Sequence, residues 1–228
     1  MVEGADRVPE SVRRRRTQGA SLLAMEPETH PLRQIRAACD DRTLTVYQAY
    51  SSAIAEPALR AGTFVAPFKR ERMTWIKPSF RWMMYRSGWG KKPGQERVLA
   101  VRIRRSGFEW ALAHACLSHY DRRQHESAAE WKQLLRESPV RVQWDPERST
   151  TQQELPHRAI QIGLTGEAVH RYVDEWIVGV TDVTALAHEA HALVRAGETA
   201  QADALVPVET AYPLPAPLRA RIGASGQG

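Results

Sequence analysis

Hydrophobic and polar residues alternate most regularly in the middle of the chain. Glu96–Arg104 places Val101 and Ile103 between polar residues with a period of two, which predicts a half-buried antiparallel strand. Thr43–Tyr50 is rich in β-branched and aromatic residues and is a second strand candidate. Further strands are expected at Arg72–Ile76, Val140–Trp144 and Ile160–Leu164.

Apolar residues recur at helical spacing between these strands. Gly166–Trp176 keeps its large apolar residues on one helical face. Pro78 precedes a helix over Ser79–Tyr85, which we expect to end at Gly88 or Gly90. Further helices are expected at Leu32–Cys39, Ala53–Arg60, Gly107–Leu117, Ala128–Arg136 and Val183–Ala196.

The order of these elements predicts the fold class. Strands and helices interleave without the regular spacing of βαβ units, which favours an α+β fold with a mainly antiparallel sheet and flanking helices. A length of 228 residues with 43% hydrophobic content fits one domain. We expect a disordered basic arm over 1–25, a single domain over 26–205, and a proline-rich strap and tail over 206–228. Met25 is an alternative translation start.

Charge and cysteine content indicate which partners and which cellular compartment to expect. The net charge of +6 and the pI of about 9.6 favour phosphate-bearing partners, although the Arg13–Arg16 run supplies much of the excess. Cys39 and Cys116 lack the spacing of a metal site or disulfide framework, which fits a reducing compartment. No stretch reaches the roughly 20 apolar residues that span a bilayer. We therefore expect a cytoplasmic protein without membrane contact.

The segment Arg72–Trp89 is the strongest local signal for function. It places three tryptophans among arginines, a lysine and serines, a composition suited to stacking on a flat ring and neutralising phosphate. Ser79 follows Pro78 at a helix start, where free backbone N–H groups bind anions. The alternative is that Trp82 and Tyr85 form the buried side of an amphipathic helix whose arginines face solvent.

Two further polar groups follow predicted strands. Asp145 and Glu147 could polarise a ribose hydroxyl or activate a nucleophile. Their alternative is an Asp–Pro turn with a surface ion pair. Glu167, close to Gln161, most simply charges the first turn of a helix. His188 and His191 lack the HExxH spacing and a third ligand, so we expect no metal site.

Four segments of the chain resemble the domain of unknown function 4291 family. They are VYQAY (Val46–Tyr50), RMTWIKPSFRWMMYRSGWG (Arg72–Gly90), VRVQWDPER (Val140–Arg148) and RAIQIGLTGEAV (Arg158–Val169). The resemblance runs from about Arg33 to Thr184, and Arg81 departs from it at a position that is usually apolar. This family is in turn remotely similar to ADP-ribosyltransferase-like folds. That similarity implies a split antiparallel sheet that holds NAD in a cleft.

The resemblance also implies a mechanism and roles for side chains. Nicotinamide would leave NAD through an oxocarbenium-like state, while the protein supplies positioning and charge stabilisation. Glu147 would orient the ribose and the acceptor, with Asp145 and Glu167 as rivals for this role. The implied catalytic residues are Glu147, Asp145 and Gln48, and the implied cofactor-binding residues are Arg36, Tyr47, Tyr50, Lys77, Ser79, Trp82, Tyr85 and Arg86.

Each implied binding residue has a specific partner on NAD. Arg36 and Gln48 would hold phosphate or ribose, and Trp82 or Tyr85 would stack on nicotinamide. The pyrophosphate would be bound by Lys77, Ser79 and Arg86.

The sequence thus predicts an ADP-ribosyltransferase-like enzyme that uses NAD as a substrate. It would transfer ADP-ribose to an acceptor, a protein or a nucleic acid, that the sequence does not identify. The first alternative is a non-catalytic nucleotide or nucleic-acid-binding module, which the basic charge and the interleaved arginines and aromatics also fit. The second alternative is a phosphotransferase or another NAD-independent enzyme on a related fold.

Overall fold

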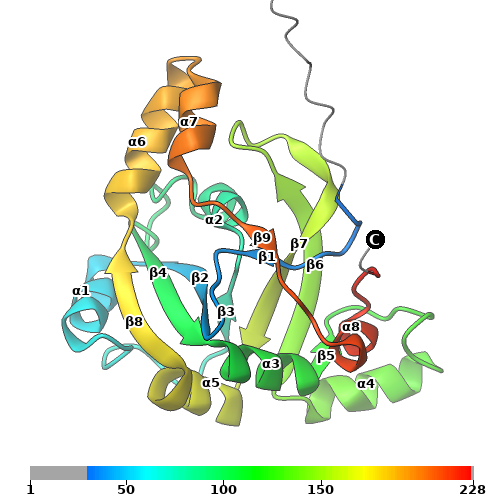
Figure 1. Ribbon diagram of the computed structural model, residues 1–228. Coiled ribbons are helices and arrows are strands. Elements are labelled where there is room, and N and C mark those ends of the chain that lie inside the picture. Colours follow the sequence, from blue (N-terminus) through cyan, green and yellow to red (C-terminus); the bar gives the residue numbers. More distant parts are fainter. Residues whose placement is uncertain (1–29, 227–228) are drawn as a thin grey trace, which may run out of the picture.

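The computed structural model describes residues 30–226, which form one α+β domain built on a split β-sheet (Figure 1). The first half has the order β2-β4-β8 and is antiparallel. Its strands are β2 (Thr43–Tyr50), β4 (Arg97–Arg104) and β8 (Ile177–Asp182). The second half has the order β3-β7-β6-β5, and only the β5–β6 pair is parallel. Its strands are β3 (Thr74–Ile76), β5 (Ala115–Leu117), β6 (Val140–Arg148) and β7 (Glu154–Leu164).

One isolated backbone bridge links the two halves, between β2 and the residue that follows β3. An isolated bridge joins Tyr47 to Lys77, in which the Tyr47 backbone N–H donates to the Lys77 carbonyl at 2.7 Å. Beyond this bridge the halves separate, and polar side chains of both can face a common space. The prediction of an α+β domain with mainly antiparallel strands is confirmed.

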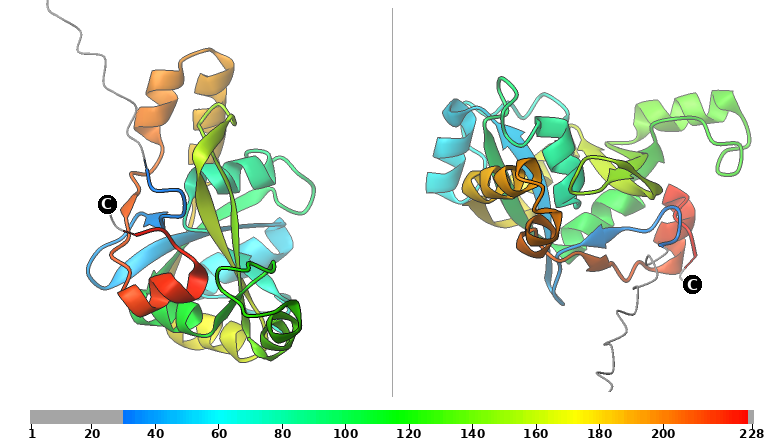
Figure 2. Two further views of the ribbon diagram at one scale, coloured as in Figure 1. Left: turned by 90° about the vertical axis from the view of Figure 1, so that its right-hand side faces the viewer. Right: turned by 90° about the horizontal axis from the view of Figure 1, so that it is seen from above.

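Helices cover the faces and ends of the split sheet (Figure 1). Helices α6 and α7 form a hairpin that projects beyond the sheets, whereas α3 and α5 lie at the opposite end (Figures 1 and 2). Their bounds are α1 (Ser52–Ala61), α2 (Phe80–Ser87), α3 (Arg105–Ala113), α4 (Ala128–Glu137), α5 (Glu167–Arg171), α6 (Thr184–Arg195), α7 (Thr199–Leu205) and α8 (Ala216–Ile222). Helix α5 continues into a π-helical turn, Tyr172–Trp176. No helix of residues 30–226 is long and apolar enough to cross a membrane.

Two hydrophobic clusters hold these layers together. The larger one joins both halves of the sheet to α3, the π-helical turn and α8 through residues such as Val101, Phe108, Val142, Tyr172 and Ile222. The smaller one packs α2 and α6 on the outer part of the first half, through residues such as Tyr47, Met84, Val98, Ala187 and Ala190. Helix α2 is thus fixed between the two halves of the sheet.

Helix α2 has clear start and stop signals in its sequence. The Ser79 hydroxyl accepts from the Trp82 backbone N–H at 3.1 Å and caps the helix. Gly88 ends it in the left-handed region with φ of 59°, which glycine adopts without steric cost. The predicted helix after Pro78 is confirmed, including its end at Gly88.

Two predicted helices are wrong in whole or in part. Leu32–Cys39 is not helical, because Ile35 and Ala37 are buried with a period of two and Arg36–Ala37 forms strand β1, which pairs with β9 (Thr210–Ala211). The helix expected over Gly107–Leu117 ends at Ala113, because the following residues pair with β6 as strand β5. Strand β8 was not predicted. In each case pairing with a distant segment overrides the local pattern.

The domain prediction can be compared with the structure at the C-terminal end of the chain but not over the N-terminal arm. The predicted arm over 1–25 lies outside the described residues. The extended strap is present and includes β9, but the expected tail contains helix α8, which buries Ile222 in the core. Pro217 lies in the first turn of α8, where proline is tolerated because its missing N–H has no partner in a helix. The core therefore extends beyond the predicted boundary at residue 205.

Candidate functional site

A pocket of about 510 Å³ opens where the two halves of the sheet separate. Strands β2, β3, β6 and β7, helix α2 and the turn before β4 all contribute to it. The lining residues are Gln48, Ala49, Tyr50, Arg72, Met73, Thr74, Trp75, Lys77, Met83, Arg86, Gly94, Gln95, Gln143 and Gln161.

The charges of the pocket have one sign. Arg72, Lys77 and Arg86 line it, and no carboxylate is among its lining residues. Arg72 and Arg86 are exposed, whereas Lys77 is only 6% exposed. Two arginines at the rim and a buried lysine below them form a site suited to an anion, and to phosphate oxygens in particular.

The Lys77 amine is buried and has few hydrogen-bond partners. Its Nζ donates to the Trp75 carbonyl over a long distance of 3.4 Å, and among residues 30–226 the structure shows no ion pair for it. Burial first, and the nearby Arg86 guanidinium second, lower the pKa of Lys77 to about 8, although Asp145 acts in the opposite direction. A buried ammonium without a close anion destabilises a fold, so it marks a position retained for another reason.

Two glutamines hold Asp145 behind the pocket wall. Gln143 and Gln161 face each other across the β6–β7 pair. The Gln143 Nε2 donates to one Asp145 oxygen at 2.8 Å, and the Gln161 Nε2 donates to the other. Both amide groups are thus turned toward Asp145, and no bond to either side-chain carbonyl is seen in residues 30–226. Those carbonyl oxygens can accept from the hydroxyl groups of a ligand.

Gln48 organises the opposite wall. Its Oε1 accepts from the buried Tyr172 hydroxyl at 2.7 Å, and its Nε2 donates to the Tyr50 hydroxyl at 2.8 Å and to the Thr74 hydroxyl at 2.7 Å. Burial raises the pKa of Tyr50 to about 12. Both N–H donors of Gln48 are therefore engaged within the protein, and the geometry shows it positioning Tyr50 and Thr74.

The Trp75 indole forms part of the wall because Gly163 leaves room for it. Trp75 pairs with Gly163 between β3 and β7, and a Cβ at Gly163 would lie 3.0 Å from Trp75 Cζ2 and from Met73 Sδ. A side chain at this position would push the indole from its place. Glycine is thus required here by a close approach, although its backbone angles are ordinary.

A second pocket of about 340 Å³ continues the first. Tyr50, Arg72, Met73, Thr74 and Gly94 line both pockets. The second pocket adds apolar and aromatic surface from Ile54, Pro67 and Phe68. Lys69 also lines the second pocket, so cationic groups lie in both pockets and the second adds apolar surface.

A recess near the start of α2 contains others of the predicted residues. Arg36, Ser79 and Glu147 line it, and its volume of about 10 Å³ is too small for a ligand. The Glu147 Oε1 accepts from the Arg148 backbone N–H at 2.8 Å, and burial raises the pKa of Glu147. The structure therefore separates Glu147 from the pocket that holds Lys77.

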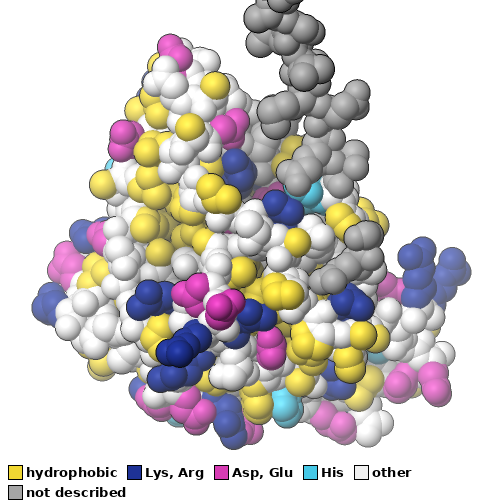
Figure 3. Space-filling view, viewed as in Figure 1, with side chains coloured by type: hydrophobic (Ala, Val, Ile, Leu, Met, Phe, Trp, Pro, Cys, Tyr) yellow, Lys and Arg dark blue, Asp and Glu magenta, His cyan; other side chains and the backbone are white. Residues whose placement is uncertain are grey.

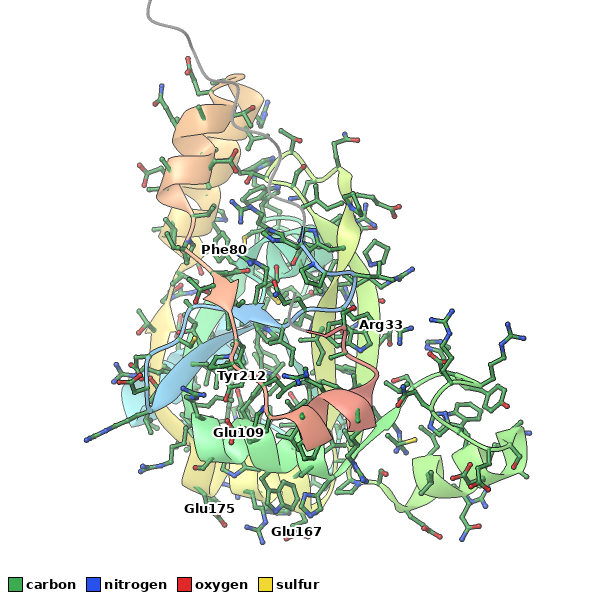
Figure 4. The ribbon with its side chains drawn as sticks, turned by 45° about the vertical axis from the view of Figure 1, so that its right-hand side comes forward. Arg33, Phe80, Glu109, Glu167, Glu175 and Tyr212 are labelled. Carbon is green, nitrogen blue, oxygen red and sulfur yellow. The ribbon has the colours of Figure 1, made fainter. Side chains whose placement is uncertain are left out.

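The anion site expected at the start of α2 is filled by the chain itself. The Phe80 backbone N–H donates to the Glu209 carboxylate of the strap at 2.6 Å, and Figure 4 shows Phe80 beside this segment. Burial and then the Glu147 carboxylate raise the pKa of Glu209 to about 8. The Arg36 guanidinium donates to the Glu209 carbonyl at 2.8 Å. Arg36 and the Phe80 backbone thus hold the strap, while Ser79 caps α2, and neither Arg36 nor Ser79 lines the pocket.

The predicted stacking residues also lie away from the pocket. Trp82 is buried and stacks on Tyr85 with ring centroids 5.1 Å apart, and the Arg148 guanidinium lies 3.9 Å from the Tyr85 ring centroid. Tyr47 is buried and meets the Phe80 ring edge-on at 5.3 Å. Trp82 is thus buried, as the alternative interpretation of the segment proposed, whereas Tyr85 is exposed.

Other candidates are accounted for by local contacts. Glu167, a rival for the catalytic role, is exposed at the far end of the molecule and accepts from Arg171 at 2.7 Å (Figure 4). His191 stacks on Trp89 at 5.3 Å and contacts Lys91. Within residues 30–226 no group of three His, Cys, Asp or Glu side chains could hold a metal ion.

The structure thus sorts the predicted residues into two groups. Gln48, Tyr50, Lys77 and Arg86 line the pocket, and Asp145 lies next to it, bonded to the lining residues Gln143 and Gln161. The prediction missed the other lining residues, among them Arg72, Thr74, Trp75, Gln143 and Gln161. The glutamines carried a usable signal, because each lies between two apolar residues of its strand: Gln143 between Val142 and Trp144, and Gln161 between Ile160 and Ile162.

A family model described as a domain of unknown function (DUF4291) matches residues 34–212. The matched range contains every residue that lines the pocket. No curated protein and no solved structure matches the chain.

Proposed function

This chain belongs to the DUF4291 family of domains of unknown function, and we propose that its pocket binds NAD and that the protein transfers ADP-ribose to an acceptor. The observation that carries the proposal is the pocket at the split of the sheet, with Arg72, Lys77 and Arg86 and no lining carboxylate. The remote resemblance to ADP-ribosyltransferase-like folds also implies a ligand between the halves of a split sheet.

The size and chemistry of the pocket fit a dinucleotide. Small-molecule sites commonly enclose about 300–1,000 Å³, and the two continuous pockets have volumes of about 510 and 340 Å³. Arg72 and Arg86 are positioned to bind the pyrophosphate, with the charge of Lys77 below them. Tyr50 and Phe68 offer aromatic surface to a base or a nicotinamide ring.

The polar wall suits the chemistry of nicotinamide loss. As the bond between nicotinamide and ribose breaks, positive charge develops on the ribose, and oxygen acceptors or a carboxylate nearby stabilise it. Gln143 and Gln161 would accept from the ribose hydroxyl groups, and Asp145 would supply the negative charge behind them. In this proposal Asp145 takes the role that the sequence gave first to Glu147. The acceptor then bonds to the ribose C1 and releases a proton.

The concave shape of the pocket favours a nucleotide over a long nucleic acid. Lys and Arg side chains are interspersed with Asp and Glu side chains over the face shown in Figure 3. A nucleic-acid-binding surface normally gathers basic side chains along one stripe. The cations that line the pocket are instead concentrated in one concave site.

Calorimetric titration with NAD and with ADP-ribose tests the proposal, with nicotinamide release followed in the same samples. We expect both ligands to bind and nicotinamide to appear slowly. Arg86→Ala removes one charged contact, so its affinity for ADP-ribose should fall about 10-fold to 100-fold, as loss of about 1.5–3 kcal/mol implies. Arg60→Ala removes an exposed arginine outside the pocket and is the matched control. Absence of binding at millimolar ligand would contradict the proposal.

A further inference from the structure

The Lys77 amine is placed as a nucleophile would be. It lines the pocket, it is 6% exposed, and its Nζ has one long hydrogen bond of 3.4 Å to a backbone carbonyl. Asp145 is close enough to influence Lys77 electrostatically, but its two oxygens accept from Gln143 and Gln161. The lone pair of a neutral Lys77 amine would therefore be free to react with a ligand in the pocket.

The backbone around Lys77 fixes the direction of its side chain. The Lys77 carbonyl accepts from the Tyr47 N–H at 2.7 Å, which ties the residue to the junction of the two sheets. Pro78 follows and restricts the backbone of Lys77 to an extended conformation. A nucleophile held at the end of a strand in this way is positioned before any ligand arrives.

The surroundings favour the neutral amine, which is the reactive form. With a pKa of about 8, about half of the Lys77 side chains are neutral at pH 8, whereas an exposed lysine with a pKa of about 10.4 is neutral in only about 0.4% of molecules. A lysine buried beside another cation is the arrangement that activates amines in covalent catalysis. Arg86 is that cation here.

We propose that Lys77 forms an imine with the C1 aldehyde of a phosphorylated ribose that is held in the pocket by Arg72 and Arg86. The inference rests on the proposed function, because the phosphate contacts bring the sugar to the amine. Its substrates are reducing sugars such as ADP-ribose, which carries a free C1 once nicotinamide has left and water has taken its place. The class also includes ribose 5-phosphate.

The reaction balances without an oxidant or a reductant. The Nζ lone pair of neutral Lys77 attacks C1 of the open-chain aldehyde, and one N–H proton passes to the former carbonyl oxygen. The carbinolamine then takes up a proton and loses water, so that the C1–O bond breaks as the C1–Nζ double bond forms. The resulting iminium is positively charged, and Asp145 lies nearby to stabilise it. The phosphate charge remains compensated by the two rim arginines.

Reductive trapping of the full chain tests the inference. The wild-type protein is incubated with ADP-ribose or ribose 5-phosphate and sodium cyanoborohydride, and adducts are located by peptide mass spectrometry. We expect one adduct per chain, on Lys77, formed at least tenfold faster than on the exposed Lys132 of α4. The rate should rise with pH and reach half of its plateau near pH 8.

Three controls make the result specific. AMP lacks a reducing sugar and should compete with ribose 5-phosphate without forming an adduct. Ribose without phosphate should label Lys77 more slowly than ribose 5-phosphate does. Lys77→Arg, with its fold checked by circular dichroism, should give no adduct at residue 77.

The outcomes separate the inference from the proposed function. If ADP-ribose binds in calorimetry but labels Lys77 no faster than Lys132, the imine proposal is wrong and the binding proposal stands. If ADP-ribose neither binds nor labels, both are wrong. Rapid labelling of Lys77 that AMP suppresses supports both.

Discussion

Two regions beside helix α2 contain buried charged groups. The protein supplies these groups with hydrogen-bond partners in one region and hardly at all in the other. At the start of α2, the Glu209 carboxylate accepts a hydrogen bond from Phe80 and Glu147 accepts one from Arg148, in a recess too small for a ligand. In the pocket, Lys77 has one long hydrogen bond and faces open space. The chain itself fills the recess, whereas the proposed function places a ligand in the pocket.

This difference shows how to separate structural from functional charges. Both regions hold polar residues with shifted pKa values, so a shifted pKa alone does not distinguish them. The number of partners that the protein supplies does distinguish them, because a buried polar group without a partner costs free energy in the absence of a ligand. By this criterion Lys77 is the buried group that lacks a partner in the protein. Both Asp145 oxygens already accept from Gln143 and Gln161, so its role in the proposed reaction rests on its place next to the pocket.

The largest expected effect is on the rate of nicotinamide release, and it distinguishes the carboxylates of the two regions. Asp145→Asn removes the negative charge behind the pocket and should slow nicotinamide release from NAD about 100-fold, a loss of about 2.7 kcal/mol in the barrier. Glu147→Gln is the matched change in the recess and should leave the rate within about threefold of wild type. Single-turnover measurements of nicotinamide release give both rates. A larger loss for Glu147→Gln would reverse the assignment of the two carboxylates.

Lys77→Met should stabilise the fold while it abolishes imine trapping. The folded pKa of Lys77 lies below its unfolded value, so the wild-type protein is penalised below pH 8 and regains stability between pH 8 and about 10.5. At pH 7 the variant should be more stable by about 1–3 kcal/mol. Urea denaturation at pH 7 and pH 10 measures this gain, which should shrink at pH 10. A variant less stable than wild type at pH 7 would mean that Lys77 has a structural role.

Glu209→Gln, in the recess, tests a pH dependence of stability that is opposite in sign to that of Lys77. The folded pKa of Glu209 lies above its unfolded value, so wild-type stability should fall as pH rises from about 4.5 to about 8. The variant keeps an oxygen acceptor for the Phe80 N–H and loses the charge, so its stability should depend less on pH, by about 1 kcal/mol across this range. Denaturation at pH 5 and pH 8 provides the comparison. Equal slopes for both proteins would show that Glu209 does not titrate there.

The smallest expected effect concerns the wall of the pocket. Gly163→Ala places a Cβ against Trp75 and Met73, so ADP-ribose affinity should fall by a few fold and stability by about 1 kcal/mol. Gly179→Ala in β8 is the matched control, because a Cβ there meets nothing within 4 Å. Titration and thermal denaturation of both variants measure the difference. Equal behaviour would show that the position of Trp75 is unimportant for binding.

Local sequence patterns were sufficient for elements whose causes are local. The alternation in Glu96–Arg104 predicted β4, and Ser79 and Gly88 predicted both ends of α2. The patterns failed where the cause lies far along the chain. Strand β1 exists because β9 pairs with it, and residues 115–117 form a strand because β6 lies beside them.

Contacts between distant segments also limited how much of the site the sequence could predict. Lys77 and Arg86 stood out within one polar, aromatic segment, and the structure brings both to the pocket. Gln143 and Gln161 became neighbours only through the register of β6 and β7. Counting by twos along β6 would place Asp145 and Glu147 on the same side. The irregular register between Pro146 and Arg148 interrupts that count, and Glu147 lines the recess.

Hydrogen exchange of the full chain with and without saturating ADP-ribose tests most directly which region takes a ligand. Ligand in the pocket should slow amide exchange in peptides that contain Arg72–Lys77, Arg86 and Gln161. Exchange in the strap around Glu209 should stay unchanged. Protection of the strap and of the segment around Glu147, without protection of Arg72–Lys77, would contradict the assignment of the pocket as the binding site.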